Sequence, residues 1–209
     1  MHEVEIYYDA IDKARVVRAK ELSDIAQNFR SYNGVGSPNT FSKAAIVLSY
    51  ANWEGFYNEC VGEYVNFLTS RGKKTIDTDW NLLLGILDRD FESLRSRNHS
   101  ADAKQQFITN LKLHVESDMT NFNLLIVQAR SNLNFERLTQ NFWTLNLDLR
   151  SLQKSRIRID KELVGWRHSV AHGDNPDLST MTIHEHINFV SSLLVDLADI
   201  FQYAMQSRS

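Results

Sequence analysis

The sequence contains little cysteine, proline or glycine. Among its 209 residues are one cysteine, two prolines and eight glycines. A single cysteine excludes a disulfide framework and a zinc site built from cysteines. Cys60 instead stands among aromatic residues at helical spacing, which indicates a small core residue. The two prolines, Pro38 and Pro176, lie among turn-forming residues, and the pattern between them is helical.

The sequence also lacks a long apolar run and an excess of positive charge. Its longest apolar stretches, 82–87 and 124–127, are far too short to cross a bilayer. The first residues mix acids with apolar side chains, unlike a signal peptide, so we expect a cytoplasmic protein with no membrane partner. A net charge of −3 argues against a protein that coats nucleic acid by electrostatics alone. Any nucleic-acid site must therefore be local.

The overall composition is that of one folded domain. Hydrophobic residues make up 43% of the chain and charged residues 23%, which is ample for one core and excludes disorder. We expect a single domain over 1–209, in which 38–205 forms the core of a bundle and 1–33 a helical extension packed on it. The four tryptophans are expected in the core rather than on an RNA-binding surface.

Apolar residues recur every three or four positions over most of the chain, which predicts helices. The pattern that starts at Phe41 predicts a long helix over roughly residues 39–70. The last pattern is the clearest, with an apolar stripe from Ile183 to Ala204. Thr182 and Glu185 form a capping box at its start. The expected fold class is all-α, a helical bundle.

The middle of the chain gives weaker patterns. The apolar spacing over 80–94 predicts one further helix, with a cap among residues 77–79. Asn134 and Asp160 each precede an apolar stripe and are expected to cap the helices that follow them. Residues 111–115 alternate between apolar and polar, which predicts a small extended insertion around 111–127.

The segment 159–173 has the most chemical content and reads IDKELVGWRHSVAHG. At about 100° per residue, Arg167 falls in the middle of an apolar face formed by Leu163, Val170 and Ala171. A buried guanidinium cannot lose its charge. This face must therefore pair Arg167 or open onto a polar cleft or a subunit interface.

Two histidines, His168 and His172, lie one turn apart on the adjacent side of that helix, and Gly173 ends it. An arginine, a polar residue, three more residues and a histidine, with Ala-His-Gly at the helix end, resemble the signature of HEPN domains. A Ser-Asn-Leu-Asn element at 131–134 and the pairs 159–160 and 163–164 extend the resemblance to HEPN proteins of prokaryotic conflict systems. The resemblance covers 38–205 and is strongest over 131–173.

The resemblance implies a HEPN-type bundle and a metal-independent endoribonuclease that acts as a toxin or phage-defence effector and needs no cofactor. It assigns catalytic roles to Arg167, His168 and His172. An imidazole can take the 2′-hydroxyl proton or protonate the leaving oxygen, and a guanidinium offers a planar fork of donors to phosphate oxygens. The implied partners are RNA, a second copy docked through the face of Arg167 and His172, and an antitoxin or immunity protein.

Local charge agrees with an RNA partner. Residues 150–168 hold six basic side chains against two acids, although the whole chain is acidic. The candidates for contacts to the RNA backbone are Lys154, Arg156, Arg158 and Lys161. The alternative for these residues is an ordinary solvated surface.

Other residues allow further interpretations. His168 and His172 could bind a metal together with His184 and His186. No carboxylate or cysteine accompanies them at a familiar spacing, and the last two lie in a first helical turn, where exposed histidines are common. Glu54 could face the site and orient the signature arginine, as acidic residues do in some HEPN proteins; a salt bridge or an exposed position is the alternative.

Two other function classes fit the sequence. One is a non-catalytic HEPN module that binds a nucleotide or a partner such as a nucleotidyltransferase or antitoxin. The other is a helical adaptor in which the signature is coincidental. Replacement of His172 by alanine distinguishes them from a ribonuclease, because only the ribonuclease depends on that side chain for activity.

Overall fold

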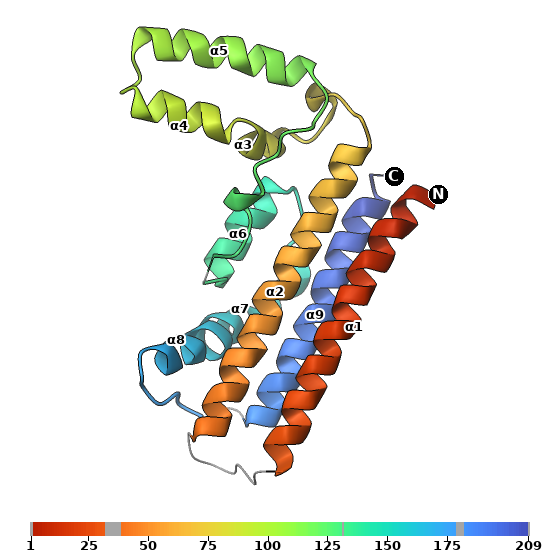
Figure 1. Cartoon of the computed structure of the whole chain (residues 1–209), viewed down its shortest axis with the longest axis vertical. Coiled ribbons are helices and arrows are strands. Elements are labelled where there is room, and N and C mark those ends of the chain that lie inside the picture. Colours follow the sequence, from red (N-terminus) through yellow and green to blue (C-terminus); the bar gives the residue numbers. More distant parts are fainter. Residues whose placement is uncertain (1, 32–38, 131, 179–181, 209) are drawn as a thin grey trace.

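Three long helices lie side by side in a computed structural model that describes residues 2–31, 39–130, 132–178 and 182–208 (Figure 1). They are α1 (His2–Ser31), α2 (Thr40–Ser70) and α9 (Ile183–Gln206), and each contacts the other two. The all-α prediction is confirmed. None of the helices in these ranges has the length and apolar content needed to cross a membrane.

The starts of α2 and α9 are fixed by reciprocal caps. Asn39 accepts a hydrogen bond from the backbone of Ser42, whose hydroxyl in turn accepts from the backbone of Asn39. Thr182 and Glu185 form the predicted capping box on α9. Each box satisfies backbone donors that the first turn of a helix leaves without partners. The predicted helix over roughly 39–70 is therefore confirmed, as is the last helix.

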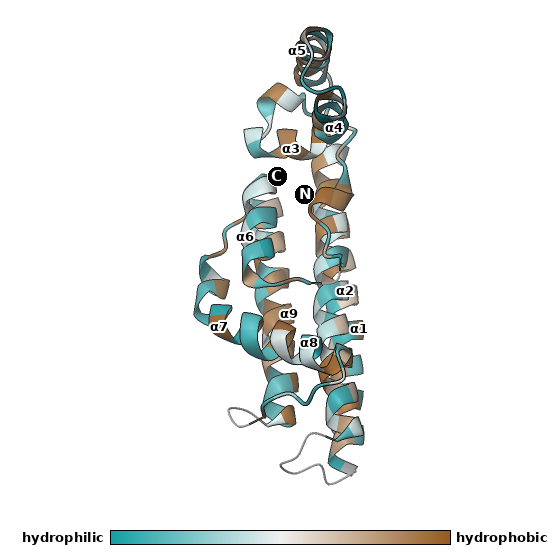
Figure 2. Ribbon diagram, turned by 90° about the vertical axis from the view of Figure 1, so that its left-hand side faces the viewer, coloured by the Kyte–Doolittle hydropathy of each residue, from teal (hydrophilic) through white to brown (hydrophobic). Residues whose placement is uncertain are grey.

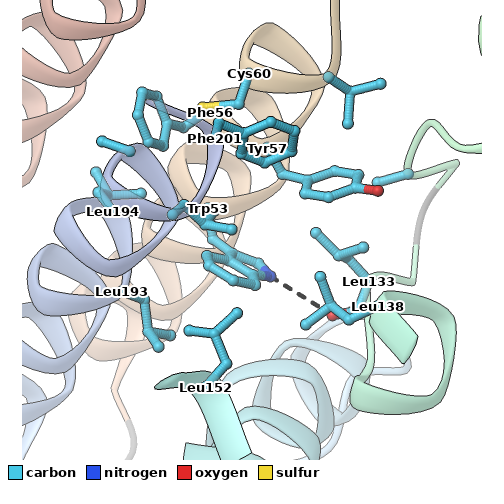
Figure 3. Close-up of a cluster of buried hydrophobic side chains, with 14 of the residues drawn as sticks. Trp53, Phe56, Tyr57, Cys60, Leu133, Leu138, Leu152, Leu193, Leu194 and Phe201 are labelled. Atoms are coloured by element: carbon cyan, nitrogen blue, oxygen red, sulfur yellow. Dashed lines mark hydrogen bonds between the residues drawn. The ribbon is translucent and has the colours of Figure 1, made fainter. Parts of the chain in front are cut away.

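The core lies where α2 and α9 meet the shorter helices, α6 (Phe135–Thr144) among them (Figure 3). Aromatic and aliphatic side chains from these elements are fully buried there. The cluster includes Trp53, Phe56, Tyr57, Cys60, Leu133, Leu138, Leu152, Leu193, Leu194 and Phe201. The core position predicted for Cys60 is confirmed, and burial raises the pKa of its thiol well above the usual value.

A connecting segment of irregular backbone, residues 127–130 and 132–134, runs along α2 and is called the strap below. The Tyr57 hydroxyl donates to the Val127 carbonyl over 2.8 Å. The Asn58 side chain accepts from the Ala129 backbone over 2.8 Å and donates to its carbonyl over 3.3 Å. Asn141 of α6 donates to both the Tyr57 hydroxyl and the Val127 carbonyl. Side chains thus replace the partners that a strand neighbour would supply.

An arm projects beyond one end of the bundle (Figures 1 and 2). It consists of α4 (Asp88–Ser96) and α5 (Ala101–Glu116), joined by a short turn, with Phe91 against Phe107 at 5.3 Å between ring centroids. The extended structure predicted around 111–127 is wrong, because 111–116 belongs to α5 and 124–126 form a 3₁₀ turn. Only one isolated bridge, between Lys74 and Asp118, is extended pairing in the described chain. The alternating pattern over 111–115 predicted the wrong structure because its apolar residues are not all buried: Leu113 is 61% exposed on the thin arm.

The single helix predicted over 80–94 is broken into three pieces. A 3₁₀ turn at Trp80–Leu82 leads into α3 (Leu83–Ile86), and α4 follows after Leu87 leaves helical geometry. The Phe122 ring lies so close to Gly85 that a Cβ there would be 2.2 Å from it. Tertiary packing of 122–123 on this turn therefore overrides the local pattern. The predicted cap among 77–79 is also wrong, because the structure shows no side-chain cap from Asp79.

Two of the four tryptophans are not in the core. Trp53 and Trp166 are buried, as predicted, but Trp80 and Trp143 are 63% and 58% exposed. The exposed pair lies on or beside short elements that have no further layer over them. Their indole faces are therefore open to solvent.

Candidate functional site

The signature residues lie at the end of a helical run that changes type on the way. It comprises α7 (Arg156–Arg158), a π-helical segment (Ile159–Gly165) and α8 (Trp166–Ala171). A π-helical turn is wider than an α-helical turn. Such turns are rare in proteins, and those that occur are frequently found at functional sites. Each π residue advances less around the axis than an α residue, so the predicted face at about 100° per residue is rotated. Leu163 is buried as expected, but Val170 is only half-buried and Ala171 is exposed.

The predicted cap at Asp160 is wrong, and the structure gives this residue another role. Asp160 lies inside the π-helical segment, where its Oδ1 accepts a hydrogen bond from the Phe135 backbone over 2.7 Å. Asn134 caps the same helix, α6, by accepting from the Arg137 backbone over 2.9 Å, as predicted. Asp160 therefore caps α6 and ties it to the signature helix.

Arg167 lies half-buried against α2. Its guanidinium carbon is 5.1 Å from the centroid of the Tyr50 ring, within the range of a cation–π contact. Tyr50 is 2% exposed, and its hydroxyl accepts a hydrogen bond from the Leu133 backbone over 2.8 Å. Trp53 donates to the carbonyl of the same Leu133 over 3.5 Å (Figure 3). The arginine therefore rests on a ring that α2 and the strap hold in place.

Glu54 also meets Tyr50, one turn further along α2. Burial, opposed by the Leu133 N–H, raises the pKa of Tyr50 to about 12. The charge of Glu54 and its hydrogen bond to the hydroxyl raise that pKa too, while the Arg167 charge lowers it. The structure thus brings Glu54 and Arg167 to the same tyrosine, one at the hydroxyl and one over the ring. Tyr50 was not predicted as a site residue, because its only signal in the sequence is its position four residues before Glu54.

The two signature histidines form an exposed pair. The ring centroids of His168 and His172 are 4.3 Å apart, with the planes inclined by 54°. Both residues are exposed, as expected for side chains one turn apart on a solvent-facing side of α8. The structure therefore places two imidazoles together in solvent on the same helix as the anchored Arg167.

The end of α8 fixes the backbone of His172. The Gly173 N–H donates to the Val170 carbonyl over 3.1 Å, and the Asp174 N–H donates to the Ser169 carbonyl over 2.8 Å. Gly173 has a φ of +86°, which completes a Schellman motif. A residue with a Cβ is strained in this conformation. The glycine of the Ala-His-Gly ending thus sets where His172 leaves the helix.

The histidines of α9 do not join the signature pair. His186 is fully buried, not exposed as expected, and its ring packs on that of Trp166 at 5.1 Å between centroids. Burial, reinforced by the charge of Arg158, lowers its pKa to about 4. His184 lies instead against Arg30, with 3.0 Å between Nε2 and Nη2. In the described parts of the chain, no three histidine, cysteine or acidic residues are grouped to hold a metal.

The four basic candidates for RNA contacts divide into two groups. Lys154, Arg156 and Lys161 are exposed, although Arg156 also lies 5.7 Å from the centroid of a buried phenylalanine ring. Arg158 instead packs toward α9, with its guanidinium 3.8 Å from the Phe189 ring centroid and its Nε 2.9 Å from Glu162. Its charge is already engaged within the protein, so it is the least suited of the four to meet a phosphate.

Comparison with protein families gives a match over most of the chain. The family model described as RiboL-PSP-HEPN matches residues 14–203, from within α1 to within α9. No curated protein and no solved structure matches the chain. The family match spans nearly the whole chain, including the strap and the signature helix. The chain belongs to the RiboL-PSP-HEPN family and is a HEPN-type helical domain.

Proposed function

We propose that this HEPN domain is a metal-independent endoribonuclease. The observation that carries the proposal is the exposed pair of His168 and His172, 4.3 Å apart, on the short helix whose Arg167 is anchored over Tyr50. Titratable imidazoles beside a permanent cation are the groups that cleavage through the ribose 2′-hydroxyl requires. The family match supports an RNase-type role, and the residues supply its chemistry.

In the proposed reaction the 2′-oxygen attacks the adjacent phosphorus, and the bond from phosphorus to the 5′-oxygen breaks. His172 takes the 2′-hydroxyl proton or gives a proton to the leaving 5′-oxygen, and His168 is an auxiliary to it. Arg167 stabilises the charge that develops on the phosphate oxygens. The products are a 2′,3′-cyclic phosphate and a 5′-hydroxyl, so atoms and charges balance without an oxidant or a metal.

A second copy of the chain is the proposed partner at the face that carries Arg167 and His172. An apolar stripe on the first half of α2 remains in solvent and comprises Phe41, Ala44, Val47, Leu48 and Ala51. Its larger members are 46%, 38% and 48% exposed. Val47 lies two helical turns before Glu54, so the stripe borders the side of α2 that holds Tyr50 and Arg167. A dimer through this stripe would bring two signature helices close together.

Equilibrium ultracentrifugation tests the dimer. We expect a dimer for the wild type and a monomer for Leu48→Asp, because the aspartate charge would be buried at the interface. Val17→Asp is the matched control, since Val17 is 56% exposed on α1 outside the stripe. A monomeric wild type, or a Leu48→Asp variant that stays dimeric, contradicts this part of the proposal.

The biological role that fits such an activity is that of a cytoplasmic toxin or phage-defence effector restrained by an antitoxin or immunity protein. The resemblance to conflict-system HEPN proteins supports this role. Expression of the wild type should then slow the growth of the host, and expression of His172→Ala should not. Equal growth of both strains at equal protein levels contradicts the toxin role.

The enzymatic proposal is tested with purified wild type, Arg167→Ala and His172→Ala incubated with total RNA in EDTA. Cleavage by the wild type that is lost in both variants is the expected result. Arg97→Ala, which replaces an exposed arginine at the tip of the arm, should cleave like the wild type. Equal fragments from all proteins, or none from any, would leave a non-catalytic HEPN binding module as the function.

A further inference from the structure

A cleft of about 550 Å³ opens between the arm, the strap and α6, apart from the histidine pair. Leu125 and Ile126 form an apolar part of its lining. The remaining lining is polar and includes two arginines, Arg130 and Arg137. A concave surface that combines apolar side chains with converging polar groups can hold a small molecule or a nucleotide.

Most arginine and amide side chains of this cleft form few or no ion pairs and hydrogen bonds with the described residues. Arg130 is exposed and forms no ion pair with any described residue, and Arg137 donates only a 3.4 Å bond to the Gln140 side chain. Gln128 and Asn132, which also line the cleft, form no side-chain hydrogen bond with the described residues. Four side chains that can bind phosphate oxygens or base edges therefore face the same space.

The two acids that line the cleft have partners. Asp88 accepts a hydrogen bond from Asn123 over 2.7 Å. Glu92 pairs with Arg95 over 2.8 Å. Their repulsion of an anion is reduced by these contacts, and the two cleft arginines remain as the cations without a carboxylate partner.

The cleft adjoins the signature site through the strap. Asn132 precedes Leu133, whose N–H bonds to the Tyr50 hydroxyl at 2.8 Å. The Tyr50 ring in turn carries Arg167 at 5.1 Å. One buried residue of the strap and one buried ring thus connect the lining of the cleft to Arg167.

We propose that this cleft is a nucleotide-binding subsite that holds one unstacked nucleotide of the substrate RNA, flanking the phosphate to be cut. The inference rests on the proposed function. The amides of Gln128 and Asn132 bind the base edge, and the guanidiniums of Arg130 and Arg137 bind the backbone phosphate. Single-stranded RNA is commonly recognised this way, with a splayed base bonded along its edges.

The test measures binding of a fluorescent single-stranded RNA to the His172→Ala protein, which cannot consume it in the proposed mechanism. Adding Arg130→Ala and Arg137→Ala should weaken binding about tenfold or more. The slope of log affinity against log salt should fall by about 0.7, as the loss of one phosphate contact on a single strand requires. Arg97→Ala, an exposed arginine at the tip of the arm, is the matched control and should bind within about twofold of its parent.

The outcomes separate the subsite from the enzyme. Wild-type cleavage with RNA affinity unchanged in the double-arginine variant overturns the subsite and leaves the enzyme. RNA binding that depends on both arginines, without cleavage by any protein, supports the subsite and overturns the enzyme. Absence of RNA binding, or saturation of the cleft by adenosine monophosphate as tightly as by RNA, overturns the proposal that its ligand is a nucleotide of RNA.

Discussion

The guanidinium of Arg167 lies over the ring of Tyr50, 5.1 Å from its centroid, although the two residues are 117 positions apart in the sequence. The hydroxyl of Tyr50 accepts a hydrogen bond from the Leu133 N–H, which fixes the position of the ring. This contact fixes a cation at the edge of the core instead of leaving it mobile in solvent.

Replacement of Arg167 should affect activity far more than stability. Arg167→Ala should lower the cleavage rate by about 10²–10³, the typical loss when one stabiliser of developing charge is removed. Unfolding free energy should fall by only about 1 kcal/mol, the usual size of a cation–π contact. Arg167→Lys keeps the charge but not the planar fork, so it should recover a small part of the rate. A fully active Arg167→Ala protein would show that the arginine is structural.

Replacement of Tyr50 by phenylalanine should affect stability more than activity. The ring under Arg167 remains, but the buried Leu133 N–H loses its acceptor, which should cost about 1–3 kcal/mol in denaturant unfolding. Tyr203→Phe, at a site 71% exposed, is the control and should change stability by less than about 0.5 kcal/mol. If both variants unfold at the same denaturant concentration, the bond from Leu133 does not support the site.

His186 should make the protein less stable in mild acid. Its pKa is about 4 in the folded state, against an ordinary value of 6.5, because burial disfavours its charged form. The unfolded chain therefore binds a proton between pH 6.5 and about 4 that the folded protein does not. Stability from this group is complete above pH 6.5 and falls as the pH drops through that window.

The size of the effect follows from the same pKa difference. About 2 kcal/mol should be lost between pH 7.5 and pH 5, and this loss should be absent in His186→Phe, which keeps a ring against Trp166. Denaturant unfolding of both proteins at the two pH values measures it. An equal loss in the wild type and the variant would show that His186 does not cause the acid sensitivity.

The glycine after His172 offers a matched pair of variants. Gly173 and Gly72 both have positive φ, at +86° and +56°, and a Cβ at either position would have no close neighbour. Each change to alanine should therefore cost a similar free energy of unfolding, about 1 kcal/mol. Only Gly173→Ala should also slow cleavage, because it alters the helix end beside His172. Equal cleavage rates in the two variants would separate the Schellman motif from the activity.

Local signals in the sequence predicted the parts of the fold that depend on local chemistry. The capping box of Thr182 and Glu185 and the long apolar stripes place α2 and α9 without knowledge of their partners. The break at Leu87 and the helix over 111–116 were missed, because packing of Phe122 and the geometry of the arm decide them. Asp160 was misjudged for the same reason, since the helix that it caps begins 25 residues earlier.

The candidate site could be predicted on the helix that carries the signature and at Glu54, but not in the packing between them. The spacing of Arg167, His168 and His172 is visible in one segment, and the structure brings the two histidines together. Tyr50 could not be recognised, because an aromatic residue on a long helix usually indicates core packing and its backbone partner lies 83 residues away. The π turn also escaped prediction, since a helical projection assumes constant rotation per residue.

The termini of the fragments test the central claim most directly. A single-stranded RNA is incubated in EDTA with the wild type or with His172→Ala. The end groups of the products are identified from their masses by mass spectrometry. We predict 2′,3′-cyclic phosphate and 5′-hydroxyl ends from the wild type, and intact RNA with the variant. Fragments with 3′-hydroxyl ends, cleavage that survives the loss of His172, or intact RNA with the wild type would contradict a ribonuclease built on Arg167 and His172.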